Sequence, residues 1–162
     1  MKVLGIDPGT AACGYGLVLE SGGRLKEVAG GCWRTAAREP PELRLRTIYE
    51  GVAALIEEHA PAAVVLEESF LGADARIALS VGQARGAVLV AAARAGVACA
   101  EYAPARVKQT VCGYGRADKG QVQRMVKTIL GLRETPATSH EADALAVAIC
   151  HALASPLLQV TA

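Results

Sequence analysis

Two short apolar runs, each ending at an acidic residue, constrain the fold of this chain more than any other feature. Residues 3–6 are apolar and lead into Asp7, and residues 62–66 lead into Glu67. Apolar runs of this length, without polar alternation, are typical of strands that are covered on both faces of a sheet. The sequence therefore predicts two buried strands whose C-terminal ends each carry a carboxylate.

The segments around these runs predict the rest of an α/β domain. Residues 15–19 and 24–35 have the character of strands, and Ser21-Gly22-Gly23 between them suits a hairpin. From residue 42 the apolar side chains follow helical spacing, and Pro61 ends that helix. Further helices are predicted over residues 74–95, 104–111, 119–130 and 142–153, and a fifth strand is predicted over residues 97–102.

Two predicted helices begin with capping signals. Asp118 and Thr138 each precede a helix and are followed three positions later by Gln or Glu, the spacing of a capping box. The second signal places His140 and Asp143 in the first turns of the last helix. Gly82 and Gly86, four apart in the helix over residues 74–95, would let another helix approach closely, either in the core or at a subunit interface.

Length and composition fit one compact domain. Of the 162 residues, 52% are hydrophobic, which is enough to bury a substantial core. We expect a single domain over residues 1–155 and a short C-terminal tail over residues 156–162. The formal net charge of +1 gives no general affinity for nucleic acid, so any basic surface must be local.

Cysteine usage and the chain ends predict a reducing cytoplasm. The five cysteines are an odd number and form no C-x-x-C pair, which fits reduced thiols better than disulfides or a zinc site. Between Lys2 and Asp7 there are only four residues, too few for the apolar region of a signal peptide. The uncharged segment after Asp143 is interrupted by polar residues, which favours a core helix over a membrane span.

Four residues could converge to form a metal-dependent catalytic site. Asp7 and Glu67 end two strands, and a helix packed on the sheet would add His140 and Asp143, which lie three apart on one helix face. Such a set suits Mg²⁺ or Mn²⁺, and a pair of ions can activate water and stabilise the leaving oxygen of a phosphodiester. Taken singly, each residue also fits a purely structural role, as a turn former, a solvated strand end or a favourable charge at a helix terminus.

A local excess of positive charge supplies a second indication. Between positions 106 and 127 there are six basic residues and one acid, which would suffice to bind several phosphates, although a solvated helix face explains the pattern equally well. Phe70 follows the second acidic strand end and could stack on an unpaired base, or could belong to the core. The six basic residues are Arg106, Lys108, Arg116, Lys119, Arg124 and Lys127.

An ordered set of motifs resembles the RuvC family of Holliday junction endonucleases. The opening Asp-Pro-Gly motif also occurs in more distant relatives, whereas the combination with the later motifs is specific to the family. In chain order the motifs are G-I-D-P-G-T at 5–10, G-Y-G at 14–16, L-E-E-S-F at 66–70, G-Q-A-R-G at 82–86, V-K-Q-T-V at 107–111 and H-E-A-D-A-L-A at 140–146.

The resemblance implies an RNase H-like fold, with a five-stranded mixed sheet flanked by helices on both faces. It implies a homodimer that resolves four-way DNA junctions by paired nicks in strands of like polarity, leaving 5′-phosphate and 3′-hydroxyl ends, and that works with a branch-migration complex of the RuvA and RuvB type. Two divalent cations, Mg²⁺ or Mn²⁺, would assist each subunit. By motif matching, the catalytic metal ligands would be Asp7, Glu67, His140 and Asp143.

The same resemblance assigns DNA contacts. Lys108 and Lys119 match basic residues near the scissile phosphate, Phe70 matches an aromatic that stacks at the opened junction centre, and Arg116 and Arg124 extend the predicted contact surface. Many members of the family have aspartate where this chain has His140. Because imidazole is a softer ligand than carboxylate, the histidine predicts a shift in preference from Mg²⁺ toward Mn²⁺.

Two other functions are compatible with parts of the pattern. An actin-like ATPase also places an Asp-x-Gly-Thr turn after its first strand, but it normally needs two such domains and further glycine-rich motifs. A catalytically silent junction-binding scaffold would keep the fold and the basic stretch, but it would have little need for four potential metal ligands.

Overall fold

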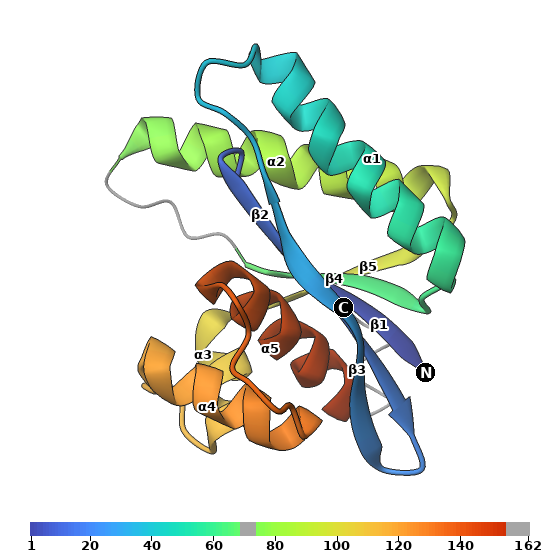
Figure 1. Ribbon diagram of the computed structural model, residues 1–162, viewed down its shortest axis with the longest axis vertical. Coiled ribbons are helices and arrows are strands. Elements are labelled where there is room, and N and C mark those ends of the chain that lie inside the picture. The colour runs from blue at the N-terminus through green and yellow to red at the C-terminus, as the bar shows by residue number, and fades with distance from the viewer. Residues whose placement is uncertain (69–73, 155–162) are drawn as a thin grey trace.

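The computed structural model describes residues 1–68 and 74–154, which form a mixed five-stranded sheet with helices on both faces (Figure 1). The strands are β1 (Lys2–Asp7), β2 (Ala12–Ser21), β3 (Arg24–Arg34), β4 (Ala63–Glu67) and β5 (Ala98–Tyr102). The helices are α1 (Pro41–His59), α2 (Ala75–Arg94), α3 (Pro104–Cys112), α4 (Lys119–Leu130) and α5 (Ser139–Leu153). The predicted five strands and five helices are confirmed, with ends that differ by a few residues.

The strand order is β3-β2-β1-β4-β5. The first three strands are antiparallel neighbours, whereas β1, β4 and β5 run parallel to one another. The predicted hairpin between β2 and β3 turns through Gly22 and Gly23, whose φ angles of 59° and 79° are those of the two-residue turn that matches strand twist. The parallel strands need helical crossovers, and α1 and α2 provide them.

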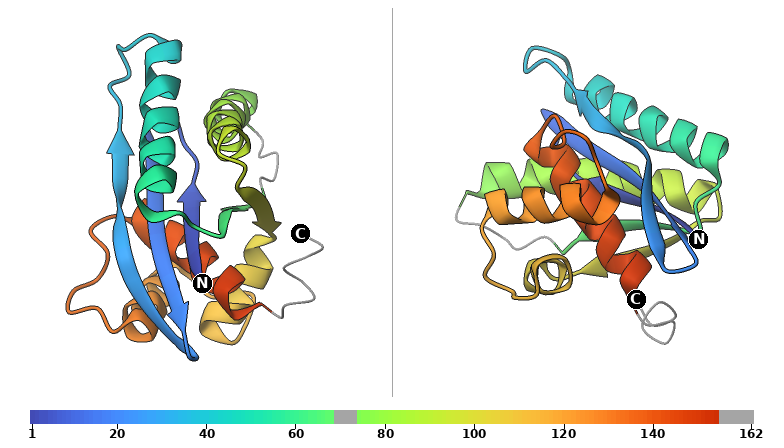
Figure 2. Two further views of the ribbon diagram at one scale, coloured as in Figure 1. Left: turned by 90° about the vertical axis from the view of Figure 1, so that its right-hand side faces the viewer. Right: turned by 60° about the horizontal axis from the view of Figure 1, so that its bottom comes forward.

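Alternation along the central strands divides the core into two layers. Leu4 and Val64 point to the side covered by α1 and α2, whereas Val3 and Val65 point to the side covered by α3, α4 and α5. Both faces of these strands are therefore buried, which explains why their sequences are continuously apolar. Figure 2 shows the two helical layers on opposite sides of the sheet.

Helix α5 is the central element of the second layer. Eleven of its fifteen residues are buried, which agrees with the prediction of a core helix after Asp143. None of the helices in the described part of the chain is both long and apolar enough to cross a bilayer. The predicted tail over residues 156–162 lies outside the described residues.

Gly82 and Gly86 of α2 do not pack closely against another helix of the same chain. Within the described residues, nothing outside the adjacent backbone of α2 lies within 4 Å of a Cβ atom added at Gly82 or Gly86. Both residues are exposed, because α2 packs on the sheet through a different face, which includes Ala84 and Val88. The core alternative for this pair of glycines is therefore wrong, and a subunit interface is the alternative that stands.

Candidate active site

Strand register places Asp7 and Glu67 side by side. In the parallel pair β1 and β4, Ile6 lies opposite Leu66, so the next residue of each strand lies at the same edge of the sheet. Alternation then directs both carboxylates to the α5 side, the side on which Val65 is buried, and leaves Glu68 exposed. Glu67, the acid that the motif assigned as a ligand, therefore faces α5, and Glu68 does not.

Glycines in β1 and β2 bring α5 against the sheet. A Cβ atom at Gly5 would overlap the carbonyl oxygen of Ala144, and one at Gly14 would overlap that of His140. Glycine removes the side chain that would separate the two layers, so the helix backbone lies directly on the strands. This close approach brings the first turns of α5 over the end of β1.

The N-terminus of α5 presents His140 and Asp143 to this edge of the sheet. The Thr138 hydroxyl accepts a hydrogen bond from the Glu141 N–H (3.0 Å) and caps the helix. The predicted capping box is only half formed, because the Glu141 carboxylate accepts the N–H of Ala137 (2.8 Å) and not that of Thr138. The cap fixes where the helix begins and therefore which residues reach the acids.

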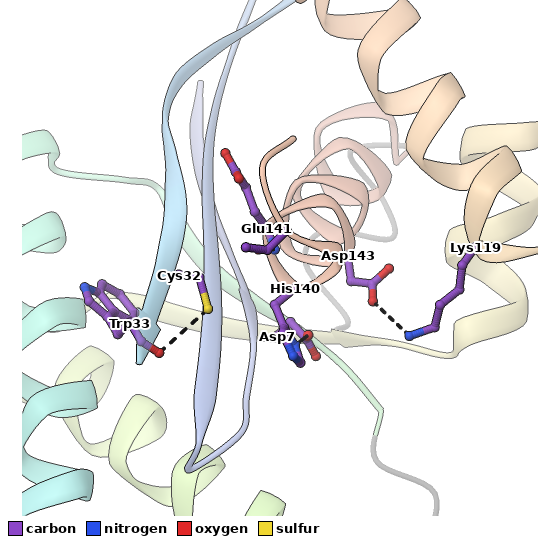
Figure 3. A network of polar contacts seen from close by, with 8 residues as sticks. Asp7, Cys32, Trp33, Lys119, His140, Glu141 and Asp143 are labelled. Carbon is purple, nitrogen blue, oxygen red and sulfur yellow. Dashed lines mark hydrogen bonds and ion pairs between the residues drawn. The ribbon is translucent and has the colours of Figure 1, made fainter. Parts of the chain in front are cut away.

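His140 and Asp143 contact different partners. The Nδ1 atom of His140 lies 2.6 Å from Oδ2 of Asp7, within hydrogen-bonding distance. Oδ2 of Asp143 lies 3.7 Å from Nζ of Lys119, the first residue of α4. Figure 3 shows Asp7 and His140 together beneath the start of α5, with Lys119 reaching Asp143 from the side.

Burial and mutual repulsion raise the pKa values of two of the acids. The pKa of Glu67 is raised to about 7, first by burial and then by the charges of Asp143 and Asp7, against the opposing effect of Lys108 and Lys119. Burial and Asp7 likewise raise the pKa of Asp143, while Lys119 and His140 lower it. The carboxylates therefore lie close enough to interact, which is the electrostatic condition that a bound cation relieves.

The chemistry of this donor set fits a divalent cation. Three carboxylates and an imidazole are suitable ligands for Mg²⁺ or Mn²⁺. In the described part of the chain, no three acidic, histidine or cysteine side chains converge on one point in the conformations present. Asp7 is held by His140 and Asp143 by Lys119, so metal binding would replace these two contacts.

The predicted DNA-contacting residues divide into three groups. Lys108 on α3 and Lys119 on α4 act electrostatically on Glu67 and thus lie beside the acids. Arg116, in the loop between α3 and α4, and Arg124 on α4 are exposed to solvent. Phe70 lies outside the described residues.

Sequence reasoning missed the residues that support the site. The overlap at Gly5 and Gly14 was not anticipated, although glycines at alternate positions of adjacent buried strands are a signal of close backbone approach. Arg85 was recognised only as part of the G-Q-A-R-G motif. In the structure its guanidinium donates a hydrogen bond to the backbone carbonyl of Glu67 (3.0 Å).

Acidic residues lie at the ends of two adjacent strands of this sheet, and α5 brings a third acid close to them. The five-stranded mixed sheet with helices on both faces is that of the RNase H-like class of proteins. Residues 3–151 match the model of the family described as crossover junction endodeoxyribonuclease RuvC. The chain therefore belongs to the RuvC family.

Individual relatives agree over nearly the whole chain. The RuvC of Desulfitobacterium hafniense is 52% identical, with 98% of this chain and 96% of that protein covered. The RuvC of Moorella thermoacetica is also 52% identical, covering 98% of this chain and 95% of the relative. The Thermus thermophilus RuvC bound to a Holliday junction substrate is 43% identical, with a TM-score of 0.90 over 94% of this chain and 93% of that one. The predicted RNase H-like fold is thus confirmed.

Proposed function

We propose that this chain resolves Holliday junctions by metal-dependent, paired nicks in strands of like polarity. The observation that supports a catalytic role most directly is the position of Asp7 and Glu67 at one edge of the sheet, where Asp143 interacts with both. A junction-binding scaffold has no need to bury like charges together, because their repulsion costs stability. Membership of a family of junction endonucleases supports the substrate class.

Asp7, Glu67, His140 and Asp143 would hold the metal. RuvC family nucleases depend on divalent metal, and we propose two Mg²⁺ or Mn²⁺ ions for each subunit. Such ions supply an activated water and stabilise the departing 3′ oxygen. Because the 3′ oxygen is the leaving group, cleavage would leave 5′-phosphate and 3′-hydroxyl ends.

The protein's own residues position the DNA and balance its charge. Lys108 and Lys119 are already within electrostatic reach of Glu67, so a phosphate between them and the acids would be drawn to the site by both ammonium groups. Arg116 and Arg124 are exposed and would contact phosphates farther along the strand. The family motif L-E-E-S-F supports Phe70 as the residue that would stack at the junction centre.

The exposed face of α2 is the proposed dimer interface. Leu79, Gly82, Gly86 and Val90 follow helical spacing along one stripe, and the two apolar side chains are 64% and 53% exposed. Together the glycines and apolar residues would let the same helix of a second copy pack closely, related by two-fold symmetry. Two symmetric subunits would place one site on each of two strands. The family resemblance favours a branch-migration complex as partner, and the cysteine usage favours a cytoplasmic location.

The experiment that tests the proposal is cleavage of a labelled synthetic four-way junction. Linear duplex of the same sequence serves as substrate control, and the reactions contain Mg²⁺, Mn²⁺ or EDTA. We expect paired nicks in the junction only, only with metal, and none from Asp7→Asn.

Glu67 and Glu68 provide a matched pair of variants for the site itself. Glu67→Gln should lose cleavage, whereas Glu68→Gln should retain it, because strand alternation leaves the second acid exposed. Equal effects of the two substitutions would contradict the site assignment. Junction binding without nicks in either metal would instead support the scaffold function.

A further inference from the structure

Arg85 of α2 connects that helix to the end of the strand that bears Glu67. Its NH1 group donates a hydrogen bond to the backbone carbonyl of Glu67 (3.0 Å), and its NH2 group forms an ion pair with Glu101 of β5. The Arg85 side chain is only 15% exposed. A charged group that is largely removed from water needs such partners, so this arrangement is held with little freedom.

The contact acts on the Glu67 peptide and not on its carboxylate. Glu67 is the last residue of β4, and its side chain points to the α5 side, whereas α2 covers the other side of the sheet. The next residue is also bonded to β5, because the Glu68 N–H donates a hydrogen bond to the Tyr102 carbonyl (2.9 Å). Arg85 thus restrains the peptide plane at the point where β4 leaves the sheet.

We propose that Arg85, itself oriented by Glu101, is a positioning residue that fixes the direction of the Glu67 carboxylate. The inference rests on the proposed role of Glu67. A small rotation of the peptide at the end of β4 would move the Glu67 carboxylate, three bonds from the backbone, by about 1 Å. Misplacement of a catalytic group by about 1 Å can reduce a rate by about 100-fold. A guanidinium that bonds two acceptors at once suppresses this rotation.

A second contact of α2 shows the same kind of restraint at the neighbouring strand. The hydroxyl of Ser80 is hydrogen-bonded to that of Thr10, three residues after Asp7. Arg44 of α1 also donates to the Thr10 hydroxyl (3.1 Å). Helix α2 therefore contacts the chain near the ends of both strands that carry the acids, through residues five apart.

The test compares Arg85→Ala, Arg85→Lys and Glu101→Gln with wild type. Single-turnover junction cleavage at saturating metal should fall by about 10- to 100-fold in Arg85→Ala. Arg85→Lys should recover part of the rate, because a single ammonium keeps the charge but not the fork that reaches two acceptors. Arg46→Ala is the matched control, because it also removes an arginine paired with a glutamate, Glu50, but one that is exposed on α1, and it should cleave at the wild-type rate.

Two further measurements separate positioning from folding and from DNA binding. Junction affinity in EDTA should stay within about twofold of wild type, and Mn²⁺ binding, followed by electron paramagnetic resonance without DNA, should weaken in Arg85→Ala. Urea unfolding establishes that each variant is folded at the assay temperature. If Arg85→Ala does not fold, Arg85→Lys and Glu101→Gln make the same comparison.

Glu67→Gln, measured in parallel, distinguishes failure of this inference from failure of the proposed site. If Glu67→Gln cleaves normally, the site assignment is wrong and Arg85 has nothing to position. If Glu67→Gln is inactive while the folded Arg85 variants cleave and bind Mn²⁺ as wild type does, only the role of Arg85 is refuted. A rate loss matched by an equal loss of junction affinity would also overturn it, in favour of a DNA contact.

Discussion

Gly14→Ala should displace the first turn of α5 and thereby impair both stability and cleavage. The added Cβ would overlap the His140 carbonyl and would lie 2.9 Å from the Cβ of His140. Carbon atoms normally approach to about 3.5–4.0 Å, so relief of the second contact alone requires a shift of roughly 0.6–1.1 Å. The overlapping atom is backbone, which no change of rotamer can move away.

The expected size of the effect follows from that shift. Overpacking of a well-packed core costs about 1–3 kcal/mol, and for a domain of this size each kcal/mol lowers the melting temperature by about 2–4 °C. We therefore expect the melting temperature to fall by roughly 2–12 °C. A displacement of His140 approaching 1 Å should reduce single-turnover cleavage by up to about 100-fold at temperatures where the variant is folded.

The control is Gly22→Asn in the hairpin after β2. Gly22 has φ of 59°, and among residues 1–68 and 74–154 only its two chain neighbours come near an added Cβ. Asn-Gly is also a preferred pair in this kind of turn. This variant should match wild type in melting temperature and in cleavage. Calorimetry and junction cleavage measure both quantities. A Gly14→Ala protein with unchanged stability and rate would refute the argument that glycine sets the distance between α5 and the sheet.

Three further predictions concern the cap, the metal and pH. Asp118→Ala removes the side chain that accepts a hydrogen bond from the Gln121 N–H (2.8 Å). Urea titrations should show a free energy of unfolding lower by about 1 kcal/mol. An unchanged value would show that water replaces the cap. His140→Asp should raise the ratio of the cleavage rate in Mg²⁺ to that in Mn²⁺, and an unchanged ratio would exclude the histidine as the source of metal preference. Burial lowers the pKa of His151 in the folded protein below its ordinary value of 6.5. The preference of the fold for the neutral imidazole therefore contributes fully to stability above pH 6.5, and this contribution is lost as the pH falls from 6.5 through the lowered pKa. His151→Phe should unfold more easily at neutral pH, because the Tyr102 hydroxyl loses the ring nitrogen that lies 2.8 Å away. In thermal melts, the stability of this variant should vary less between pH 7 and pH 5 than that of wild type. Parallel curves of stability against pH for the two proteins would contradict this.

Local patterns predicted most of the elements because each element is encoded by short-range chemistry. The continuous apolar runs before Asp7 and Glu67 predicted buried strands, since both faces of a central strand must be covered. The capping box at Asp118 predicted the start of α4 at Lys119. The motif L-E-E-S-F assigned Glu67 as a ligand, and alternation along β4 accounts for the exposure of Glu68 beside it.

Other features could be established only with the elements assembled. The spacing of Gly82 and Gly86 predicted close packing of another helix, either in the core or at a subunit interface. The sequence does not specify which face of α2 meets the sheet, and only the structure shows that the glycines lie on the other face. The capping-box spacing at Thr138 was only half realised, because the Glu141 carboxylate found the Ala137 N–H. The partners of His140 and Asp143 depend on how α5 and α4 pack together.

The sequence by itself determined the strands, the helices and the four candidate ligands, because spacing, capping and motif order are properties of neighbouring residues. Only the tertiary structure decided that Asp7 and Glu67 meet in register, that α5 lies directly on β1 and β2, and that Arg85 holds the Glu67 peptide. These are contacts between residues 18 to more than 100 positions apart in the chain. They depend on how whole layers pack, and that depends on the shape and volume of every side chain between them.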